Sequence, residues 1–134
     1  MSTLSCGTNH TPSTPPTVVI ADDEQDVRDL MRELLEECGF TVFEASSGET
    51  VLEAAAGRHI DLVVLDLVMP GMEGLETLRA LRREYPNLKV MVVSGAFGGS
   101  FLRAARILGA NAVLKKPFSC ELFLERVGAL LDVG

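Results

Sequence analysis

The chain has 134 residues, of which 47% are hydrophobic and 23% are charged, so it can form one globular domain with a buried core. No apolar run approaches the roughly 20 residues of a membrane span, and no secretory signal precedes the domain, so we expect a cytoplasmic protein without membrane contact. The net charge of −7 argues against direct nucleic-acid binding, because phosphate contacts need clustered lysine and arginine.

The N-terminal stretch differs in composition from the rest of the chain. Residues 1–17 contain no Asp, Glu, Lys or Arg and are mostly Ser, Thr, Pro, Gly and Asn, which favours disorder. We therefore expect a disordered leader or linker over residues 1–17 and a folded domain over residues 18–134. The three cysteines, Cys6, Cys38 and Cys120, are far apart and odd in number, which predicts reduced thiols.

From Val18 onward, short apolar runs that fit buried strands alternate with helical patterns of apolar residues. The expected strands are Val18–Ala21, Phe40–Glu44, Leu62–Leu65, Val90–Val93 and Ala112–Leu114. One helical pattern follows each strand: the first is ended by Gly39, the second opens on a capping box at Ser46–Glu49, the third stops before Pro86, the fourth reaches about Leu108, and the fifth spans about Cys120–Leu131.

Strict alternation of strands and helices predicts an α/β domain in which helices cover both faces of a parallel sheet. Five such units predict a flavodoxin-like, doubly wound five-stranded sheet with strand order 2-1-3-4-5 and five helices. Thr41 and Glu44 make the second strand more polar than the others, as is typical of an edge strand.

Asp66 ends the unbroken apolar run Leu62–Leu65, and Pro70, Gly71 and Gly74 mark a loop after it. Ligands of open α/β sheets bind beyond the carboxyl ends of the strands, so Asp66 stands where a site is expected. The same carboxylate can instead accept hydrogen bonds from loop amides, which is a common role of Asp.

Polar residues end four of the five predicted strands. Asp22 and Asp23 follow the first strand, Asp66 the third, Ser94 the fourth and Lys116 the fifth. Three carboxylates in one crevice repel one another unless a cation compensates, and Mg²⁺ prefers such oxygen ligands. A metal, a free carboxylate, an ammonium and a hydroxyl together indicate phosphoryl transfer through an aspartyl phosphate.

Each of these residues also has a purely structural role open to it. Asp22 and Asp23 can cap the helix that follows them. Ser94 can be a loop serine, and Lys116 can be a solvated lysine. The site is favoured because these roles do not explain why suitable polar residues end four strands at the same edge.

Four motifs resemble the receiver domain of two-component response regulators, over about Val18–Leu131. They are VVIADDE at 18–24, LDLVMPGMEG at 65–74, VSG at 93–95 and LKKPF at 114–118, in the family's order and spacing. The resemblance implies a signalling domain rather than an enzyme. Such a domain assists its own phosphorylation and dephosphorylation.

The resemblance also implies roles for individual residues. Asp66 would accept a phosphoryl group from a phosphohistidine on a histidine kinase or histidine phosphotransfer protein, and Ser94 and Lys116 would bind the phosphoryl oxygens. The changed surface would then act on a downstream protein or output domain.

For the metal, the resemblance implies that Mg²⁺ is bound by Asp23, Asp66 and the backbone carbonyl of Val68, with Asp22 acting through water. One feature departs from the family. An aromatic residue usually lies three positions before the lysine, and this chain has Val113 there, so the aromatic half of the family's switch is missing.

Two other functions are open at this stage. An unphosphorylated pseudo-receiver that acts as a fixed protein-interaction surface typically lacks site residues, and none is missing here. An aspartyl-phosphate hydrolase of the haloacid-dehalogenase type usually has a second Asp two residues after the nucleophile, where this chain has Val68.

Overall fold

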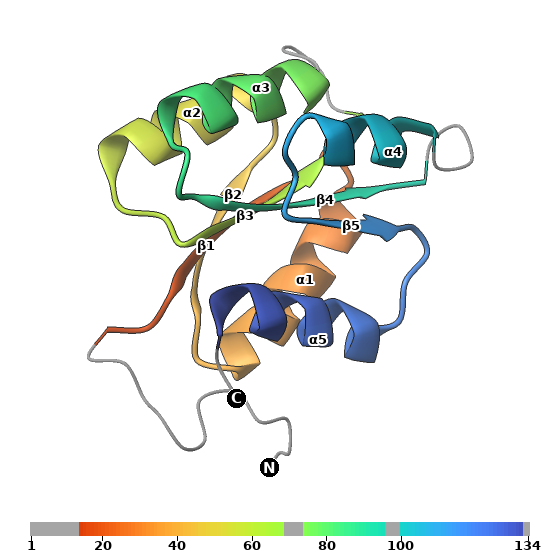
Figure 1. Cartoon of the computed structure of the whole chain (residues 1–134). Helices are drawn as coiled ribbons and strands as arrows, with labels where there is room; N and C mark the ends of the chain where they lie inside the picture. The colour runs from red at the N-terminus through yellow and green to blue at the C-terminus, as the bar shows by residue number, and fades with distance from the viewer. Residues whose placement is uncertain (1–13, 69–73, 96–99, 133–134) are drawn as a thin grey trace.

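The computed structural model describes residues 14–68, 74–95 and 100–132 (Figure 1). Most of the leader predicted over residues 1–17 lies outside this part, and the first strand begins at Thr17. The boundary between leader and domain therefore stays a prediction. Within the described ranges, no helix has the length and apolar character needed to cross a bilayer.

Five parallel strands form one sheet in the order β2-β1-β3-β4-β5, which confirms the predicted topology. The strands are β1 (Thr17–Ala21), β2 (Thr41–Ala45), β3 (Leu62–Asp66), β4 (Lys89–Ser94) and β5 (Ala112–Lys115). The helices that alternate with them are α1 (Gln25–Glu37), α2 (Gly48–Gly57), α3 (Gly74–Glu84), α4 (Ser100–Ile107) and α5 (Cys120–Leu131). As predicted, β2 is an edge strand.

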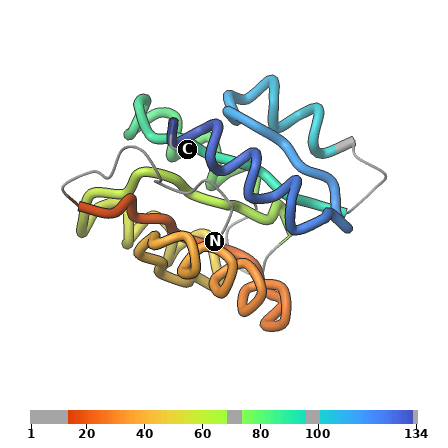
Figure 2. The backbone as a smooth tube through the Cα atoms, turned by 90° about the horizontal axis from the view of Figure 1, so that it is seen from below, coloured from red at the N-terminus to blue at the C-terminus, as the bar shows by residue number. Residues whose placement is uncertain are grey.

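The core has two halves, one on each face of the sheet. Val19 and Ala21 of β1 join the half covered by α2, α3 and α4, whereas Val18 and Ile20 join the half covered by α1 and α5 (Figures 1 and 2). Every residue of β3 is buried, because this central strand has helices on both faces. Burial of one such leucine or valine stabilises the fold by about 1.5–3 kcal/mol.

Local sequence signals predicted where α1 ends and where α2 begins. Gly39 follows α1 with φ +89°, the left-handed conformation that glycine adopts without strain, so the predicted end of this helix is confirmed. The capping box of α2 is formed by Ser47 and Thr50, one residue later than predicted. The Thr50 hydroxyl accepts the Ser47 amide at 3.2 Å, a role that the prediction gave to Glu49.

The cysteine prediction is wrong at one position. Cys38, next to the end of α1, is disulfide-bonded, whereas Cys120 is free. Pairing depends on how closely two cysteines approach in the folded chain, and spacing in the sequence does not report that distance.

Gly74, the first residue of α3, brings this helix close to the segment that follows β3. A Cβ atom at Gly74 would lie 2.3 Å from the Cα of Leu67, and the Gly74 amide donates a 3.2 Å hydrogen bond to the Leu67 carbonyl. The first residue of α3 therefore packs directly against the main chain next to Asp66.

Candidate functional site

The residues predicted from the strand ends lie together at the carboxyl edge of the sheet. Asp22 follows β1, Asp66 ends β3, Ser94 ends β4 and Lys116 follows β5. A cleft of about 370 Å³ at this edge is lined by Asp66, Ser94 and Lys116, together with Asp23, Glu24, Val68 and Gly95. The parallel topology thus collects in one place side chains that are far apart in the sequence.

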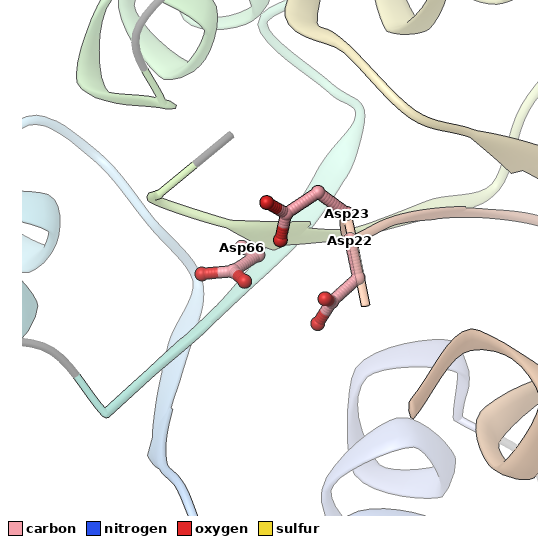
Figure 3. Close-up of side chains that lie close together, drawn as sticks. All are labelled: Asp22, Asp23 and Asp66. Carbon is pink, nitrogen blue, oxygen red and sulfur yellow. The ribbon is translucent and has the colours of Figure 1, made fainter. Parts of the chain in front are cut away.

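Three carboxylates approach one another at this edge. Each of Asp22, Asp23 and Asp66 offers one oxygen, and these oxygens all lie within 4.8 Å of one another (Figure 3). Asp22 is fully buried and Asp66 is 5% exposed, while Asp23 is exposed to solvent. The donor set consists of hard carboxylate oxygens, which suits Mg²⁺ or a similar cation.

Asp22 and Asp66 each divide their two oxygens between a turn and the site. Asp22 Oδ1 accepts the Glu24 amide at 2.9 Å, and Asp66 Oδ1 accepts the Val68 amide at 3.1 Å. The other oxygen of each carboxylate accepts a hydrogen bond from Lys116 Nζ. Asp66 therefore makes the loop-amide contact considered from the sequence. Asp22 and Asp23 do not cap α1, because its N-cap residue is Glu24 and no side-chain hydrogen bond caps this helix.

Lys116 is the cation of the cleft. Its Nζ lies 2.7 Å from Asp22 Oδ2, 3.1 Å from Asp66 Oδ2 and 3.1 Å from Glu24 Oε1, and its side chain is 16% exposed. Gly95 allows the end of β4 to approach it, because a Cβ there would already lie 3.3 Å from the Lys116 Cβ. Lys116 is therefore not a solvated lysine, which was the alternative role considered from the sequence.

Burial and neighbouring charges shift the pKa values of Asp66 and Lys116. Burial raises the pKa of Asp66, the amide of Val68 opposes this, and the charge of Asp22 adds to it. Burial lowers the pKa of Lys116, but its hydrogen bonds to Asp22 and Glu24 and the charge of Asp66 outweigh that effect and raise the pKa above the usual lysine value. Lys116 therefore stays charged at neutral pH.

Ser94 and Val68 lie at the cleft as expected. Ser94 is 1% exposed, lines the cleft, and its main-chain carbonyl accepts the Lys116 amide at 3.1 Å. Val68, which is 48% exposed, also lines the cleft. The role of the Val68 carbonyl as a metal ligand stays a prediction.

Val113, at the position where the family usually has an aromatic residue, is half-buried in β5. It packs against the core half under α2, α3 and α4, and its carbonyl accepts a 3.1 Å hydrogen bond from the Arg126 guanidinium of α5. The loop segment 96–99 beyond β4 lies outside the described residues.

Two residues that contact the site were assigned no role there from the sequence. Glu24 was noted only as part of a motif, yet it contacts Lys116. Arg28 of α1 was not considered, although its guanidinium donates to the main-chain carbonyl of Asp22 and to Glu44 of β2. The available signal was a pair of arginines four residues apart in the predicted helix, Arg28 and Arg32, followed by an acidic residue in the next strand.

Comparison with known proteins identifies relatives in sequence and in structure. The sequence model of the response regulator receiver domain matches residues 18–128. Response regulator MprA of Mycobacterium ulcerans is 37% identical over 114 residues, which are 85% of this chain and 49% of MprA. Sensor kinase CckA of Brucella abortus is 37% identical over 118 residues, which are 87% of this chain and 12% of the kinase. This chain thus spans about half, or less, of these curated relatives.

Solved structures share the fold. The CheY-like receiver domain protein of Methanospirillum hungatei has a TM-score of 0.84 at 26% identity, over 89% of this chain and 95% of that chain. CheY4 of Vibrio cholerae has a TM-score of 0.81 at 26% identity, over 88% of this chain and 100% of that chain. Because the family match covers most of the described fold, this chain belongs to the response regulator receiver domain family, a family of signalling domains in two-component systems.

Proposed function

We propose that this domain accepts a phosphoryl group from a phosphohistidine on Asp66 and passes the signal to a partner through a changed surface. The observation that carries the proposal is the position of Asp66 in the cleft. Its Oδ2 lies 3.1 Å from the ammonium of Lys116, and the same cleft is lined by Asp23 and Ser94.

The transfer is a displacement at phosphorus. A carboxylate oxygen of Asp66 attacks the phosphorus atom in line with the P–N bond of the donor phosphohistidine. The new O–P bond forms as the P–N bond breaks, the imidazole nitrogen keeps the bonding electron pair, and it then takes a proton from solvent. Asp66 becomes an acyl phosphate. Such a reaction needs chiefly positioning of the two reactants and neutralisation of the phosphoryl oxygens.

The cleft offers groups for both needs. The Lys116 ammonium neutralises phosphoryl charge, and the Ser94 hydroxyl donates a hydrogen bond to a phosphoryl oxygen. Mg²⁺, which Asp23, Asp66 and the Val68 carbonyl would hold, with Asp22 acting through water, supplies further neutralisation of charge. The domain thereby assists its own phosphorylation. Dephosphorylation is hydrolysis, in which water attacks the acyl phosphate, inorganic phosphate leaves and the Asp66 carboxylate is restored.

The relatives support the choice of partners. Matches to a response regulator and to a sensor kinase favour a histidine kinase or histidine phosphotransfer protein as the phosphoryl donor. The recipient of the signal is a downstream protein or an output domain. We further propose residues 18–134 as the functional domain and the cytoplasm as its compartment.

Intact mass spectrometry tests the proposal. The wild-type chain is incubated with acetyl phosphate and MgCl₂, or with the phosphorylated histidine-containing domain of a sensor kinase. We expect a gain of one phosphoryl group, which is lost in Asp66→Asn, lost with chelator, and retained in Asp132→Asn, a control at the exposed end of α5.

Two results would contradict the proposal. Sustained release of phosphate over many turnovers without an accumulating adduct would indicate a hydrolase. No adduct with either donor would indicate a domain that signals without phosphate.

A further inference from the structure

We propose that Arg28 is a positioning residue for the metal site: it holds the main chain between Asp22 and Asp23 in the conformation that binds a divalent cation. This inference rests on the proposed function, because it concerns the cation which that function requires. It adds a residue that is not among those lining the cleft and that acts through the main chain of Asp22.

The contacts of Arg28 show how it acts. One terminal nitrogen, Nη1, donates to the main-chain carbonyl of Asp22. Nε donates to Glu44 Oε1 at 3.0 Å, and Nη2 donates to the side chain of Gln25. The side chain is 13% exposed. A planar guanidinium with three such partners has little freedom to move, so the Asp22 carbonyl is fixed relative to α1 and β2.

Glu44 anchors this arrangement on the sheet. It lies on β2 opposite Ile20 of β1, so its side chain points to the face covered by α1. Its second oxygen, Oε2, accepts a 2.6 Å hydrogen bond from Arg32 Nη1. Glu44 is therefore held by two arginines of the same helix, and Arg28 alone of the two reaches on to Asp22.

A hydrogen bond to the Asp22 carbonyl can control how the side chains of Asp22 and Asp23 are oriented. It belongs to the peptide unit that joins Asp22 to Asp23, so its orientation sets the directions of both side chains. A hydrogen bond from the Glu24 amide to Asp22 Oδ1 fixes the next peptide of the turn. Residues that orient metal ligands typically change metal affinity about 10–100-fold when they are removed.

The direction in which Mg²⁺ affinity changes when Arg28 is removed distinguishes a positioning role from an effect of its charge alone. Arg28 places a positive charge next to Asp22 of the metal site, and this charge by itself opposes the binding of a second cation. If Arg28 acted only through its charge, its removal would strengthen Mg²⁺ binding. If it positions the turn, its removal weakens Mg²⁺ binding in spite of the lost repulsion.

The experiment compares Mg²⁺ dissociation constants, from calorimetric or NMR titration of the full chain without phosphoryl donor. The variants are Arg28→Gln, Arg28→Lys and the control Arg32→Gln, which removes a cation bonded to the same Glu44 but no contact with Asp22. Amide hydrogen exchange at Asp23 and Glu24, measured in chelator, gives a readout that does not depend on the metal.

We expect Arg28→Gln to raise the dissociation constant about tenfold or more and to speed amide exchange at Asp23 and Glu24. Arg28→Lys keeps the charge but lacks the planar fork, so it should weaken binding too, and it provides the test if Arg28→Gln does not fold. Arg32→Gln should stay within about twofold of the wild type.

Equal affinities for the Arg28 variants and Arg32→Gln, or tighter binding by Arg28→Gln, would overturn the inference. Failure of the proposed function looks different. In that case the wild-type chain itself would show no Mg²⁺ binding, while the effect of Arg28 on amide exchange in chelator would still be measurable.

Discussion

Asp22 and Lys116 stand 94 residues apart in the sequence, and the Oδ2 of Asp22 accepts a 2.7 Å hydrogen bond from the ammonium of Lys116. Asp22 is fully buried and the Lys116 side chain is 16% exposed, so water screens this pair poorly. The pair connects the ends of β1 and β5 across the sheet, and Asp66 lies beside both partners. A single ammonium therefore compensates buried charge from two strands.

Removal of Lys116 should destabilise the fold in the absence of metal. Lys116→Met leaves buried Asp22 without its cation, and we expect a loss of about 2–4 kcal/mol in the free energy of unfolding at pH 7 in chelator. Mg²⁺ should restore part of this loss, because it supplies positive charge to the same carboxylates. Urea unfolding with and without Mg²⁺ measures both effects.

Lys115→Met is the matched control for this substitution. Lys115 is the neighbouring residue with an exposed side chain, so its loss should change the free energy of unfolding by no more than about 0.5 kcal/mol. Equal losses for the two lysines would mean that the contacts between Lys116 and the carboxylates contribute nothing to stability.

Addition of Mg²⁺ should stabilise the wild-type chain, and Asp66→Asn should remove most of this effect. A ligand that binds only the folded state adds about 1.4 kcal/mol at a concentration ten times its dissociation constant. Asn keeps the size of the side chain but lacks the charge that the cation needs. The measurement is the urea midpoint at increasing Mg²⁺ for both proteins, and an undiminished gain in Asp66→Asn would exclude this carboxylate as a ligand.

Gly74→Ala should disturb the segment beside Asp66. The added Cβ would lie 2.3–2.7 Å from main-chain atoms of Leu67, which cannot rotate away as a side chain can. We expect a destabilisation of about 1–3 kcal/mol and slower phosphorylation of Asp66. Thermal unfolding and the rate of adduct formation measure the two effects.

Gly57→Ala is the control for this prediction, because a Cβ atom at helical Gly57 would meet no described residue within 4 Å beyond its chain neighbours and its own helix backbone. Alanine has the better helix propensity, so Gly57→Ala should be neutral or stabilising by up to about 1 kcal/mol. A neutral Gly74→Ala would show that α3 can move away from Leu67 at little energetic cost.

The sheet and the cleft were predictable because their signals are carried by residue types. Apolar runs such as Leu62–Leu65 mark strands buried on both faces, and parallel topology sends every strand end to the same edge. The sequence therefore predicts that Asp66, Ser94 and Lys116 lie together. The strand order followed from the common arrangement of five alternating units, and the structure has that order.

The Arg28 contact, the position of the capping box and the disulfide could not be predicted, because they depend on contacts that residue types alone do not indicate. The acceptor for Arg28 is a main-chain carbonyl of Asp22, and every residue has such a carbonyl. The capping box at Ser47 required knowing which of two adjacent serines precedes the first helical turn. The disulfide at Cys38 required knowing a distance in space.

Glu44 should make the stability of the domain depend on pH in the acidic range. Its hydrogen bond to Arg32 lowers its pKa below 4.5, burial opposes this, and Arg28 adds to the lowering. As pH falls below about 4.5, the unfolded state binds the proton first, so the stabilisation contributed by ionised Glu44 is complete above that pH and is lost as pH falls through the folded-state pKa.

Glu44→Gln removes this titration. At pH 7 the variant should be about 1–2 kcal/mol less stable than the wild type, because two arginines lose a charged acceptor. The difference should shrink as pH falls from about 4.5 to 3, since the wild type then loses the same interaction. Urea midpoints across this range measure it, with Glu36→Gln as control, because Glu36 pairs with Arg32 through a side chain that is 48% exposed. A difference between Glu44→Gln and wild type that stays constant down to pH 3 would mean that the two arginines do not hold Glu44 through its charge.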